Sequence, residues 1–499
     1  MNQTRTSLLV MAIFIAALLA GIARSPSQAS VIDNDSRAEL PQVVTGYQLD
    51  LPLIQIRTPI QTAYGIELHN LSSSGRIGDT KAAGASWTRR NSLLWSNVEP
   101  TEGTYEWSSS FDQELKNASQ SGLQTILTVR STPEWAQKYE GVFCGPPSEE
   151  KLQAFGDFMY QAVKRYSTPP YNILYWQIWN EPDVHPESMW PYGVPGNSVY
   201  GCLGNAADSR FYGGGYYAKM LEAAYPRMKE ANPNVQVVIG GLLLACKIDV
   251  GCTKQSDGSQ FQGQNYLEGI LDNNGKKDGK NYFDIVAFHA YDDYWDYGIY
   301  GNGGWGGLST ENGPVIALKA GFLRSVLEKY GAADKPLITT ELALRCGPGA
   351  DAPSCSDQDP NSNFAKTKAY YIAEAYATGI ASGLKAVIWY DFDGGWRNTA
   401  LTDDKGNLMP AYYAFQASRR ILQDARFSKN LEFQGLKGYE FTRGNRTIWI
   451  LWSMDGNLHP AELTYGLPDK AYDHLETPVD VTTTTIDVGL VPIYLEWKR

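Results

Sequence analysis

Runs of buried-strand character alternate with amphipathic segments along most of this chain. Each run is rich in Ile, Val, Leu and aromatic residues, as strands covered on both faces should be. Strand and helix in alternation over more than about 250 residues indicate an α/β fold, an eight-stranded (β/α)8 TIM barrel. The eight strands are predicted at 63–68, 85–94, 123–130, 173–179, 235–244, 283–290, 336–340 and 384–390.

Helices are predicted between these strands. They cover residues 111–121, 149–166, 216–231, 266–273, 315–330 and 366–382. The alternative is an open doubly wound sheet, which would need a Gly-rich phosphate-binding turn after the first strand. The sequence has no such turn there, and the barrel is therefore favoured.

The pattern changes after about residue 425. Short alternating strands are predicted at 431–433, 439–442, 447–452, 482–488 and 492–497, with turns such as Asp455-Gly456-Asn457 between them. We therefore predict a catalytic barrel over 59–425 and a small C-terminal antiparallel β-sandwich domain over 426–499. Residues 31–58 are interpreted as a linker, or as strands that join the β domain.

The first 30 residues are typical of an export signal. Arg5 precedes an uncharged apolar run over 8–22, and Ser27-Gln28-Ala29 offers a small-residue cleavage site. The run is short for a membrane span, which needs about 20 apolar residues, although an uncleaved N-terminal anchor is a second interpretation. We expect a secreted or extracytoplasmic protein, in the periplasm or at the cell surface.

Six cysteines fit an oxidising compartment, where an even count suggests disulfides. Six cysteines allow 15 pairings. The short gaps in sequence favour the pairs Cys246–Cys252 and Cys346–Cys355, which leaves Cys144–Cys202 as the third pair. No CxxC spacing exists and only five His are present, so neither a metal nor a cofactor is expected.

The net charge and the aromatic content of the chain indicate which classes of partner it can bind. A net charge of -11 argues against a nucleic-acid surface. The 14 Trp and 31 Tyr must mostly serve packing, but some can stack on sugar rings in a cleft. A carbohydrate substrate is the expected partner, and nothing in the sequence specifies an oligomeric state.

Two glutamates stand at the ends of predicted strands. Glu181 follows the fourth strand within Trp179-Asn180-Glu181-Pro182, and Glu341 follows the seventh. The carboxyl ends of barrel strands share one mouth, where chemistry is usually done. Two carboxyl groups ~5–5.5 Å apart are what a retaining glycosidase requires. The sequence therefore predicts that Glu181 and Glu341 face each other there.

Several motifs together resemble the clan A glycoside hydrolases, in particular β-xylosidase-like or endoglycanase-like members. They are Trp179-Asn180-Glu181-Pro182, Glu341, 95–100 with 103–107, and 398–403 leading to 410–413. The resemblance spans residues 60–420. It implies that Glu181 is the acid/base, that Glu341 is the nucleophile, and that Asn180 bonds the sugar 2-hydroxyl.

The resemblance implies further contacts around these carboxylates. Tyr291 would bond the nucleophile, and His289 would line the first sugar subsite. Trp389 would form the floor on which the bound ring stacks.

Two other segments are also expected to contact substrate. Arg89 would hold the nucleophile ionised; it is preferred to Arg90 because strand alternation puts it on the same side as Trp87. Trp87 is itself predicted to contact substrate. The loop 292–312 is a candidate binding wall, where Trp295 and Trp305 could stack on further sugars.

These features predict an exported retaining glycoside hydrolase that cleaves β-glycosidic bonds of oligo- or polysaccharides by double displacement. One alternative is a catalytically inactive carbohydrate-binding barrel, although such a protein would normally have lost one glutamate. A metal-dependent barrel enzyme is another, but it would need His and Asp ligands at strand ends, where only His289 is supported.

Overall fold

The computed structural model describes residues 63–72, 75–185, 201–205, 207–245, 265–302, 304–305, 307–346, 355 and 358–499. The predictions for residues 1–58 and for the pair Cys246–Cys252 lie outside this part of the chain.

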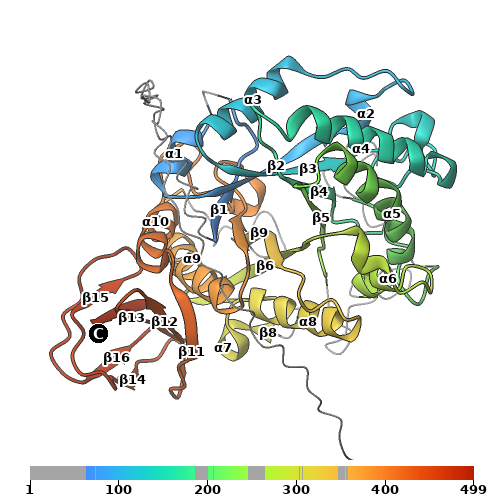
Figure 1. Cartoon of the computed structure of the whole chain (residues 1–499). Helices are drawn as coiled ribbons and strands as arrows, with labels where there is room; N and C mark the ends of the chain where they lie inside the picture. Colours follow the sequence, from blue (N-terminus) through green and yellow to red (C-terminus); the bar gives the residue numbers. More distant parts are fainter. Residues whose placement is uncertain are drawn as a thin grey trace, which may run out of the picture. The chain divides into compact units, whose positions relative to one another are not determined.

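Eight parallel strands form the centre of the fold (Figure 1). Their ladders run in the order β5-β4-β3-β2-β1-β10-β9-β6. Isolated parallel bridges, Val238↔Ile285 and Leu242↔Phe288, join β5 to β6. This pairing is consistent with a TIM-like barrel and matches the predicted strands within a few residues, apart from the longer carboxyl ends of β6 and β9. The strands are β1 (Tyr64–Glu67), β2 (Trp87–Leu94), β3 (Gln124–Arg130), β4 (Tyr175–Asn180), β5 (Gln236–Gly241), β6 (Val286–Asp296), β9 (Leu337–Arg345) and β10 (Ala386–Trp389).

Helices connect the strands, and apolar residues at helical spacing line their buried faces. In α4, for example, Phe155, Phe158, Ala162 and Tyr166 are all buried. The helices are α1 (Ile77–Ala82), α2 (Trp95–Val98), α3 (Ser109–Gln120), α4 (Leu152–Tyr166), α5 (Gly214–Ala231), α6 (Tyr266–Asp272), α7 (Ser309–Asn312), α8 (Ile316–Lys329), α9 (Asn363–Ala381) and α10 (Pro410–Leu422). Short 3-10 turns are η1 (Glu134–Ala136), η2 (Glu149–Lys151), η7 (Gly279–Tyr282) and η9 (Trp396–Asn398).

The strands enclose a hydrophobic cluster of their own. Gly65 of β1 gives this cluster room, because a Cβ there would come within 2.7 Å of the Trp87 Cβ and 2.4 Å of the Ile388 Cδ1. A residue without a side chain therefore lets Trp87 and Ile388 pack close to the backbone of the first strand. The cluster consists of Trp87, Ile126, Tyr175, Val238, Ile285, Ala287, Ile338, Ala386 and Ile388.

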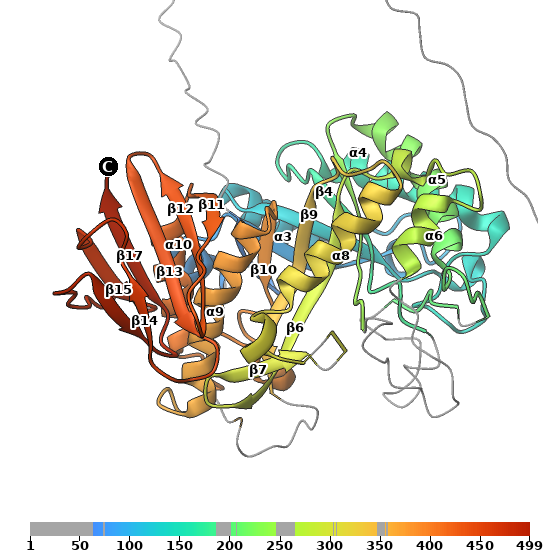
Figure 2. The same ribbon diagram turned by 90° about the horizontal axis from the view of Figure 1, so that it is seen from below.

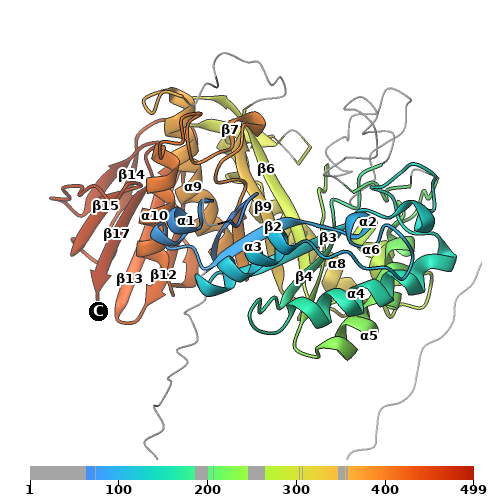
Figure 3. The ribbon, with the colours of Figure 1, turned by 90° about the horizontal axis from the view of Figure 1, so that it is seen from above.

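Two strands extend further than the sequence predicted. β6 continues to Asp296 and pairs with the hairpin strand β7 (Ile299–Asn302), which pairs with β8 (Gly307–Leu308). β9 runs to Arg345, so Glu341 lies within a strand rather than after it. Figure 3 shows β6 and β9 side by side, as their parallel pairing requires.

The C-terminal part is an antiparallel sheet, ordered β11-β12-β13-β17-β15, with a separate two-stranded sheet of β14 and β16. The first strand was misplaced in the prediction: it lies at Arg426–Asn430 and is exposed, not at 431–433. Its charged residues suit an edge strand, and they hide it from a search for apolar runs. The strands are β11 (Arg426–Asn430), β12 (Leu436–Arg443), β13 (Arg446–Ser453), β14 (His459–Glu462), β15 (Lys470–Asp473), β16 (Thr485–Val488) and β17 (Ile493–Lys498).

Both faces of the larger C-terminal sheet are apolar. One face adds Phe441, Ile450 and Tyr494 to the main core, which also contains residues of α9 and α10 (Figure 2). The other face packs Trp449 and Leu495 into a second cluster, together with side chains from β14 and β16. The alternation of inward side chains along β13 therefore serves two cores.

Two of the predicted disulfides are present. Cys144 pairs with Cys202 and Cys346 with Cys355. The first bridge lies next to the end of β4, where the Trp179 indole N–H donates to the Cys144 carbonyl at 2.8 Å. Among the described residues, no helix is both long and apolar enough to cross a bilayer.

We expect the Cys144–Cys202 bridge to contribute more stability than Cys346–Cys355. It links residues 58 apart, whereas the second links residues nine apart. The larger loop removes more entropy from the unfolded chain, so Cys144→Ala/Cys202→Ala should lower the unfolding free energy by about 2–4 kcal/mol. Cys346→Ala/Cys355→Ala should cost about 1.5 kcal/mol less. Thermal unfolding followed by circular dichroism compares them, and an equal or larger loss in the second variant would contradict the prediction.

Candidate active site

A cavity of about 480 Å³ lies at the carboxyl ends of the barrel strands. A larger cavity of about 790 Å³ exists elsewhere, but neither strand-end glutamate lines it. We therefore take the smaller cavity as the candidate site. Its lining is Glu67, His69, Arg90, Asn91, Ser92, Arg130, Asn180, Glu181, Leu243, Tyr291, Glu341, Arg345, Tyr390 and Trp396.

The end of β4 delivers two consecutive side chains to this cavity. Regular strand alternation would send Asn180 and Glu181 to opposite faces. The backbone avoids this because Trp179 and Glu181 adopt positive φ values of 69° and 45°. The Glu181 N–H donates to the Gly241 carbonyl at 3.0 Å, which ties the turn to β5. Asn180 and Glu181 therefore both face the cavity.

An irregularity in β9 presents Glu341. The register between β6 and β9 shifts by one residue, from Phe288↔Thr339 to His289↔Glu341. An extra residue in one strand re-aims the side chains that follow it. Glu341 thereby points toward the interior instead of outward, and Thr339 supports the bend by donating to the Glu341 carbonyl at 3.1 Å.

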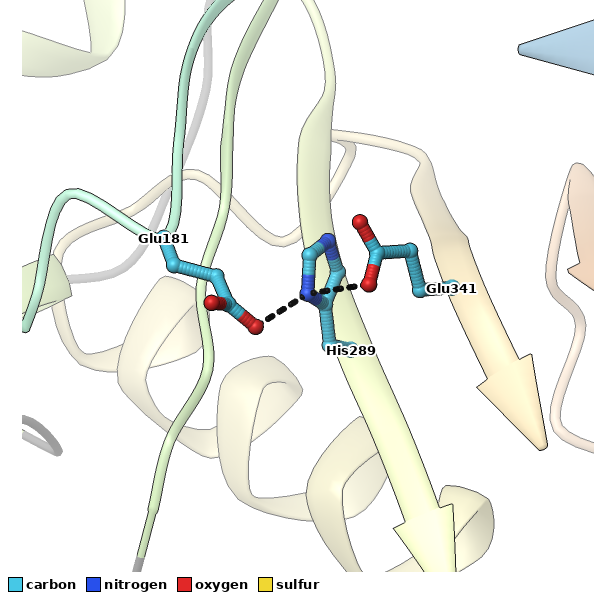
Figure 4. A group of neighbouring side chains, drawn as sticks. All are labelled: Glu181, His289 and Glu341. Atoms are coloured by element: carbon cyan, nitrogen blue, oxygen red, sulfur yellow. Dashed lines mark hydrogen bonds and ion pairs between the residues drawn. The ribbon is translucent and has the colours of Figure 1, made fainter. Parts of the chain in front are cut away.

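His289 lies between the two glutamates (Figure 4). Its Nδ1 is 2.7 Å from Glu181 Oε1 and 3.3 Å from Glu341 Oε2. One carboxylate oxygen of each glutamate and the imidazole nitrogen all lie within 4.8 Å of one another. Gly241 makes room for the ring, because a Cβ there would lie 2.1 Å from His289 Nε2.

Glu341 is surrounded by hydrogen-bond donors. Arg89 Nη1 donates to Oε1 at 2.5 Å, and the Tyr291 hydroxyl donates to Oε2. Burial raises the pKa of the Glu341 carboxyl, and the Arg89 guanidinium acts in the opposite direction. Donors that bond the charged form of a carboxylate stabilise it, so these contacts favour ionised Glu341.

Glu181 has the opposite surroundings. Burial raises the pKa of its carboxyl to about 7, against the weaker effect of Arg89. Glu181 Oε1 is hydrogen-bonded to His289, and burial lowers the pKa of that imidazole to about 3, so the ring is neutral at neutral pH. A neutral partner gives Glu181 no charge compensation. Near neutrality a large share of Glu181 is therefore protonated.

The buried Arg89 guanidinium donates hydrogen bonds to side chains of several neighbouring strands. Its Nη1 also donates to Glu67 Oε2 at 2.7 Å, and its Nη2 donates to Asn180 Oδ1 at 2.5 Å. Its Nε donates to Gln177 Oε1 at 3.2 Å. Although burial lowers the pKa of Arg89, Glu67 and Glu341 raise it above its ordinary value. Arg90, the alternative, instead pairs with Glu114.

Three predicted substrate contacts are wrong, because the side chains are buried outside the cavity lining. Trp87 belongs to the hydrophobic cluster inside the strands. Trp389 is fully buried, and its indole N–H donates to the Thr399 carbonyl at 3.0 Å. Trp305 is likewise buried and donates to the Leu244 carbonyl at 2.6 Å.

Tyr390 and Trp396 line the cavity where Trp389 was predicted. The sequence held a signal for Tyr390: Ala386 and Ile388 point inward, so Tyr390 is in phase with them. Trp295 is 60% exposed and borders an adjoining hollow of about 350 Å³, which shares Tyr291 with the main cavity.

Glu67 is a site residue that the sequence reasoning missed. It ends β1, is buried and pairs with Arg89. Its position two residues after Gly65, which faces the interior beside Trp87 and Ile388, was the available signal.

Glu181, His289 and Glu341 are also of the donor types that bind metal ions. Two contacts favour a proton instead of a cation here. The 2.7 Å separation of His289 Nδ1 and Glu181 Oε1 is that of a hydrogen bond, and the Arg89 guanidinium already neutralises Glu341. The three side chains are thus held together by a hydrogen bond and an ion-pair contact.

Comparison with known proteins places the fold. No protein-family model and no curated protein sequence matches this chain. A family 39 glycoside hydrolase from Bacteroides cellulosilyticus WH2 superposes with a TM-score of 0.63 and 18% identity, over 87% of this chain and 81% of that one. The family 30 subfamily 8 xylanase Xyn30A from Clostridium acetobutylicum superposes with a TM-score of 0.56 and 10% identity, over 88% of this chain and 96% of that one. A conserved exported protein from Bacteroides fragilis superposes with a TM-score of 0.54 and 13% identity, over 87% of this chain and 98% of that one.

Families 39 and 30 are clan A glycoside hydrolases. The chain has the fold of that clan. The resemblance predicted from the sequence is thus confirmed at the level of the fold.

Arg89→Met should destabilise the protein strongly at neutral pH. The substitution leaves Glu67 and Glu341 buried without their cation, which costs about 3–5 kcal/mol. Without Arg89 the pKa of the Glu341 carboxyl, which burial already raises, rises further, so the folded variant binds more protons than the unfolded chain. Its deficit should therefore grow as pH rises and shrink as pH falls.

Thermal unfolding at pH 5 and pH 8 tests this against Arg90→Met as the control. Arg90 and Glu114 are 13% and 17% exposed, and losing this pair should cost about 1 kcal/mol or less. A wild-type melting temperature for Arg89→Met at pH 8 would contradict the prediction.

Proposed function

We propose that this protein is an exported retaining glycoside hydrolase that cleaves β-glycosidic bonds of oligo- or polysaccharides by double displacement. The observation that carries the proposal is the pair Glu181 and Glu341, of which one carboxylate oxygen each lies within 4.8 Å of the other at one cavity. This separation is close to the ~5–5.5 Å of retaining enzymes and shorter than the ~6.5–9.5 Å that lets an inverting enzyme place a water between its carboxyls.

In the first step Glu341 attacks the anomeric carbon and Glu181 protonates the leaving oxygen. The C–O bond to the leaving sugar breaks, and a glycosyl ester forms on Glu341. The contacts support these roles because Arg89 and Tyr291 donate to Glu341, whereas Glu181 holds a proton through burial.

In the second step Glu181, now a carboxylate, takes a proton from water. The resulting hydroxide attacks the same carbon, and the ester bond to Glu341 breaks with retention of configuration. His289 supports the exchange because its Nδ1 lies beside both carboxylates. Asn180 is anchored by Arg89 next to Glu181, where it can bond the 2-hydroxyl of the sugar.

We also propose the finer organisation of the chain: a signal peptide over 1–30, a linker or added strands over 31–58, a closed (β/α)8 catalytic barrel over 59–425 and a β-sandwich domain over 426–499. The bridges between β5 and β6 support closure of the barrel. Two disulfides and a fold shared with an exported protein support export.

A catalytically inactive barrel that binds sugars is the second candidate. It is less well supported because a binding protein has no use for two buried carboxylates with opposed environments, which are costly to keep.

Glu341→Gln should reduce turnover of aryl β-glycosides by several orders of magnitude, because an amide cannot form the glycosyl ester. Glu181→Ala should lose much less rate on a dinitrophenyl glycoside, whose leaving group needs no proton, than on an alkyl glycoside. Single-substrate kinetics measure both, and circular dichroism checks folding. Wild-type turnover by folded Glu341→Gln would sink the assignment.

The pH profile should fall on its alkaline side near pH 7. The acid form of Glu181 has a raised pKa of about 7, so it is present below that pH and lost above it. Measuring kcat/KM from pH 4 to 9 on an alkyl or unactivated aryl glycoside tests this. Glu181→Ala should show no such limb with the dinitrophenyl substrate; an identical alkaline limb in that variant would assign it to another group.

A further inference from the structure

The parallel ladder that joins β5 to β6 leaves its regular course after Leu242. The Leu242 N–H donates to the Ala287 carbonyl at 3.1 Å, and the His289 N–H donates to the Leu242 carbonyl at 2.9 Å. Ladder bonds recur at every second residue, so the next one would run from the Leu244 N–H to the His289 carbonyl. Leu244 instead adopts a positive φ of 48°, and the seam between the two strands opens there.

Three side chains bond the backbone groups at this opening. Asp183 Oδ2 accepts from the Leu244 N–H at 2.8 Å, and the Trp305 indole N–H donates to the Leu244 carbonyl at 2.6 Å. The Lys319 ammonium donates to the His289 carbonyl at 2.9 Å. Buried backbone groups must be bonded, so each side chain takes the place of a partner that the adjacent strand would supply in a regular ladder.

Lys319 bonds both sides of the opening. A second N–H of its ammonium donates to the Leu243 carbonyl, on the β5 side, at 2.8 Å. The residue lies on the buried face of α8 and is 2% exposed. The other buried side chains of this helix are apolar: Ile316, Ala320, Leu323, Val326 and Leu327. A charged side chain is costly to bury on such a face, which indicates that its two bonds serve a specific purpose.

The pKa of Lys319 reflects the cost of this burial. Burial, with a smaller effect of Arg345, lowers the pKa to about 7, although Asp183 and Asp292 favour the charged form. A lysine amine that has lost one of its three protons still has two N–H groups, so both carbonyls stay bonded in either form. The two bonds, and not the charge, are therefore the constant feature of this side chain.

The opening lies beside the acid of the proposed reaction. His289, whose carbonyl Lys319 bonds, places its Nδ1 2.7 Å from Glu181 Oε1. Leu243, bonded by the same ammonium, lines the candidate cavity. Asp183, two residues after Glu181, accepts from the Leu243 N–H at 2.9 Å and so ties the turn of the acid to the same segment. A wider opening would therefore move the imidazole relative to the Glu181 carboxyl.

We propose that Lys319 is a positioning residue for Glu181: it clamps the opened end of the β5–β6 seam and so holds the His289 imidazole against the Glu181 carboxyl. The inference rests on the proposed function. Lys319 borders the adjoining hollow of about 350 Å³, whereas Glu181 lines the candidate cavity. Lys319 therefore acts on Glu181 through His289.

A merely stabilising role makes a different prediction. Lys319→Met keeps most of the stem and removes both donors, so it lowers stability under either role. The matched control is Lys368→Met, because Lys368 is a buried lysine of α9 that also bonds two backbone carbonyls, those of Asn398 and Ala400, at 2.9 and 2.7 Å. Only a positioning role separates the two folded variants in acid-dependent chemistry.

The kinetic test uses the 2,4-dinitrophenyl and phenyl β-D-glycosides of xylose, glucose and galactose, in the sugar series that the wild type cleaves fastest. Lys319→Met should lower kcat/KM for the phenyl glycoside, which needs the proton of Glu181, by about tenfold to a hundredfold. The dinitrophenyl glycoside should lose less than about threefold, because its leaving group needs no proton. Lys319→Arg should recover part of the loss, and Lys368→Met should change both substrates by the same factor. Equal losses on both substrates in folded Lys319→Met would overturn the inference.

Nitrogen NMR of the protein labelled with 15N-histidine tests the same contact without substrate, with the His289 signals assigned by their loss in His289→Gln. The Nδ1 shift should change in Lys319→Met and stay constant in Lys368→Met. An unchanged shift would overturn this inference and leave the proposed hydrolase standing. A changed shift in a protein whose wild type cleaves no glycoside or polysaccharide would support the clamp and contradict the hydrolase. If Lys319→Met does not fold, Lys319→Gln, whose shorter amide reaches less far, is measured with the same outcomes.

Discussion

The buried guanidinium of Arg89 is the interaction on which the candidate site depends. It bonds Glu67, Glu341 and Asn180, which come from three different strands. A buried charge is costly unless it is paired and its donors are bonded, and this network satisfies both conditions. Because one planar group fixes three acceptors, the distances between strand ends cannot vary independently. The Arg89 guanidinium therefore fixes the relative positions of the side chains that surround the cavity.

Departures from regular strand geometry direct further functional side chains toward the cavity. In β4 two positive φ values turn consecutive residues Asn180 and Glu181 toward the cavity. In β9 an added residue aims Glu341 inward, and in β2 another brings Arg90 beside its neighbours. A barrel of perfectly alternating strands would expose only every second side chain to its mouth. The irregularities raise the density of functional groups there, and the regular hydrophobic layer below carries the stability.

The sequence predicted the strands well because strands buried on both faces form mainly apolar runs, and the ends of those runs drew attention to Glu181, Glu341, His289 and Tyr291. The predicted substrate contacts of the tryptophans differ from the structure for geometric reasons. Trp87 shares the inner face with Arg89, but two residues along a strand is about 6.6 Å, which places it a layer beneath the cavity. Trp389 lies out of phase with inward-facing Ile388. Trp305 stands in a Gly-rich loop, where periodicity says nothing about which carbonyl its indole meets.

The two glutamates differ through their neighbours and not through their depth, since both are buried. Glu341 meets donors that favour its anion, whereas Glu181 meets an uncharged imidazole. A neutral imidazole nitrogen accepts or donates according to its tautomer. His289 Nδ1, 2.7 Å from Glu181 Oε1, can therefore accept from the protonated acid that the first displacement requires. Because the ring is uncharged, the proton stays on Glu181 until the leaving oxygen takes it, and burial rather than a charged neighbour sets the acid role of Glu181 in the proposed reaction.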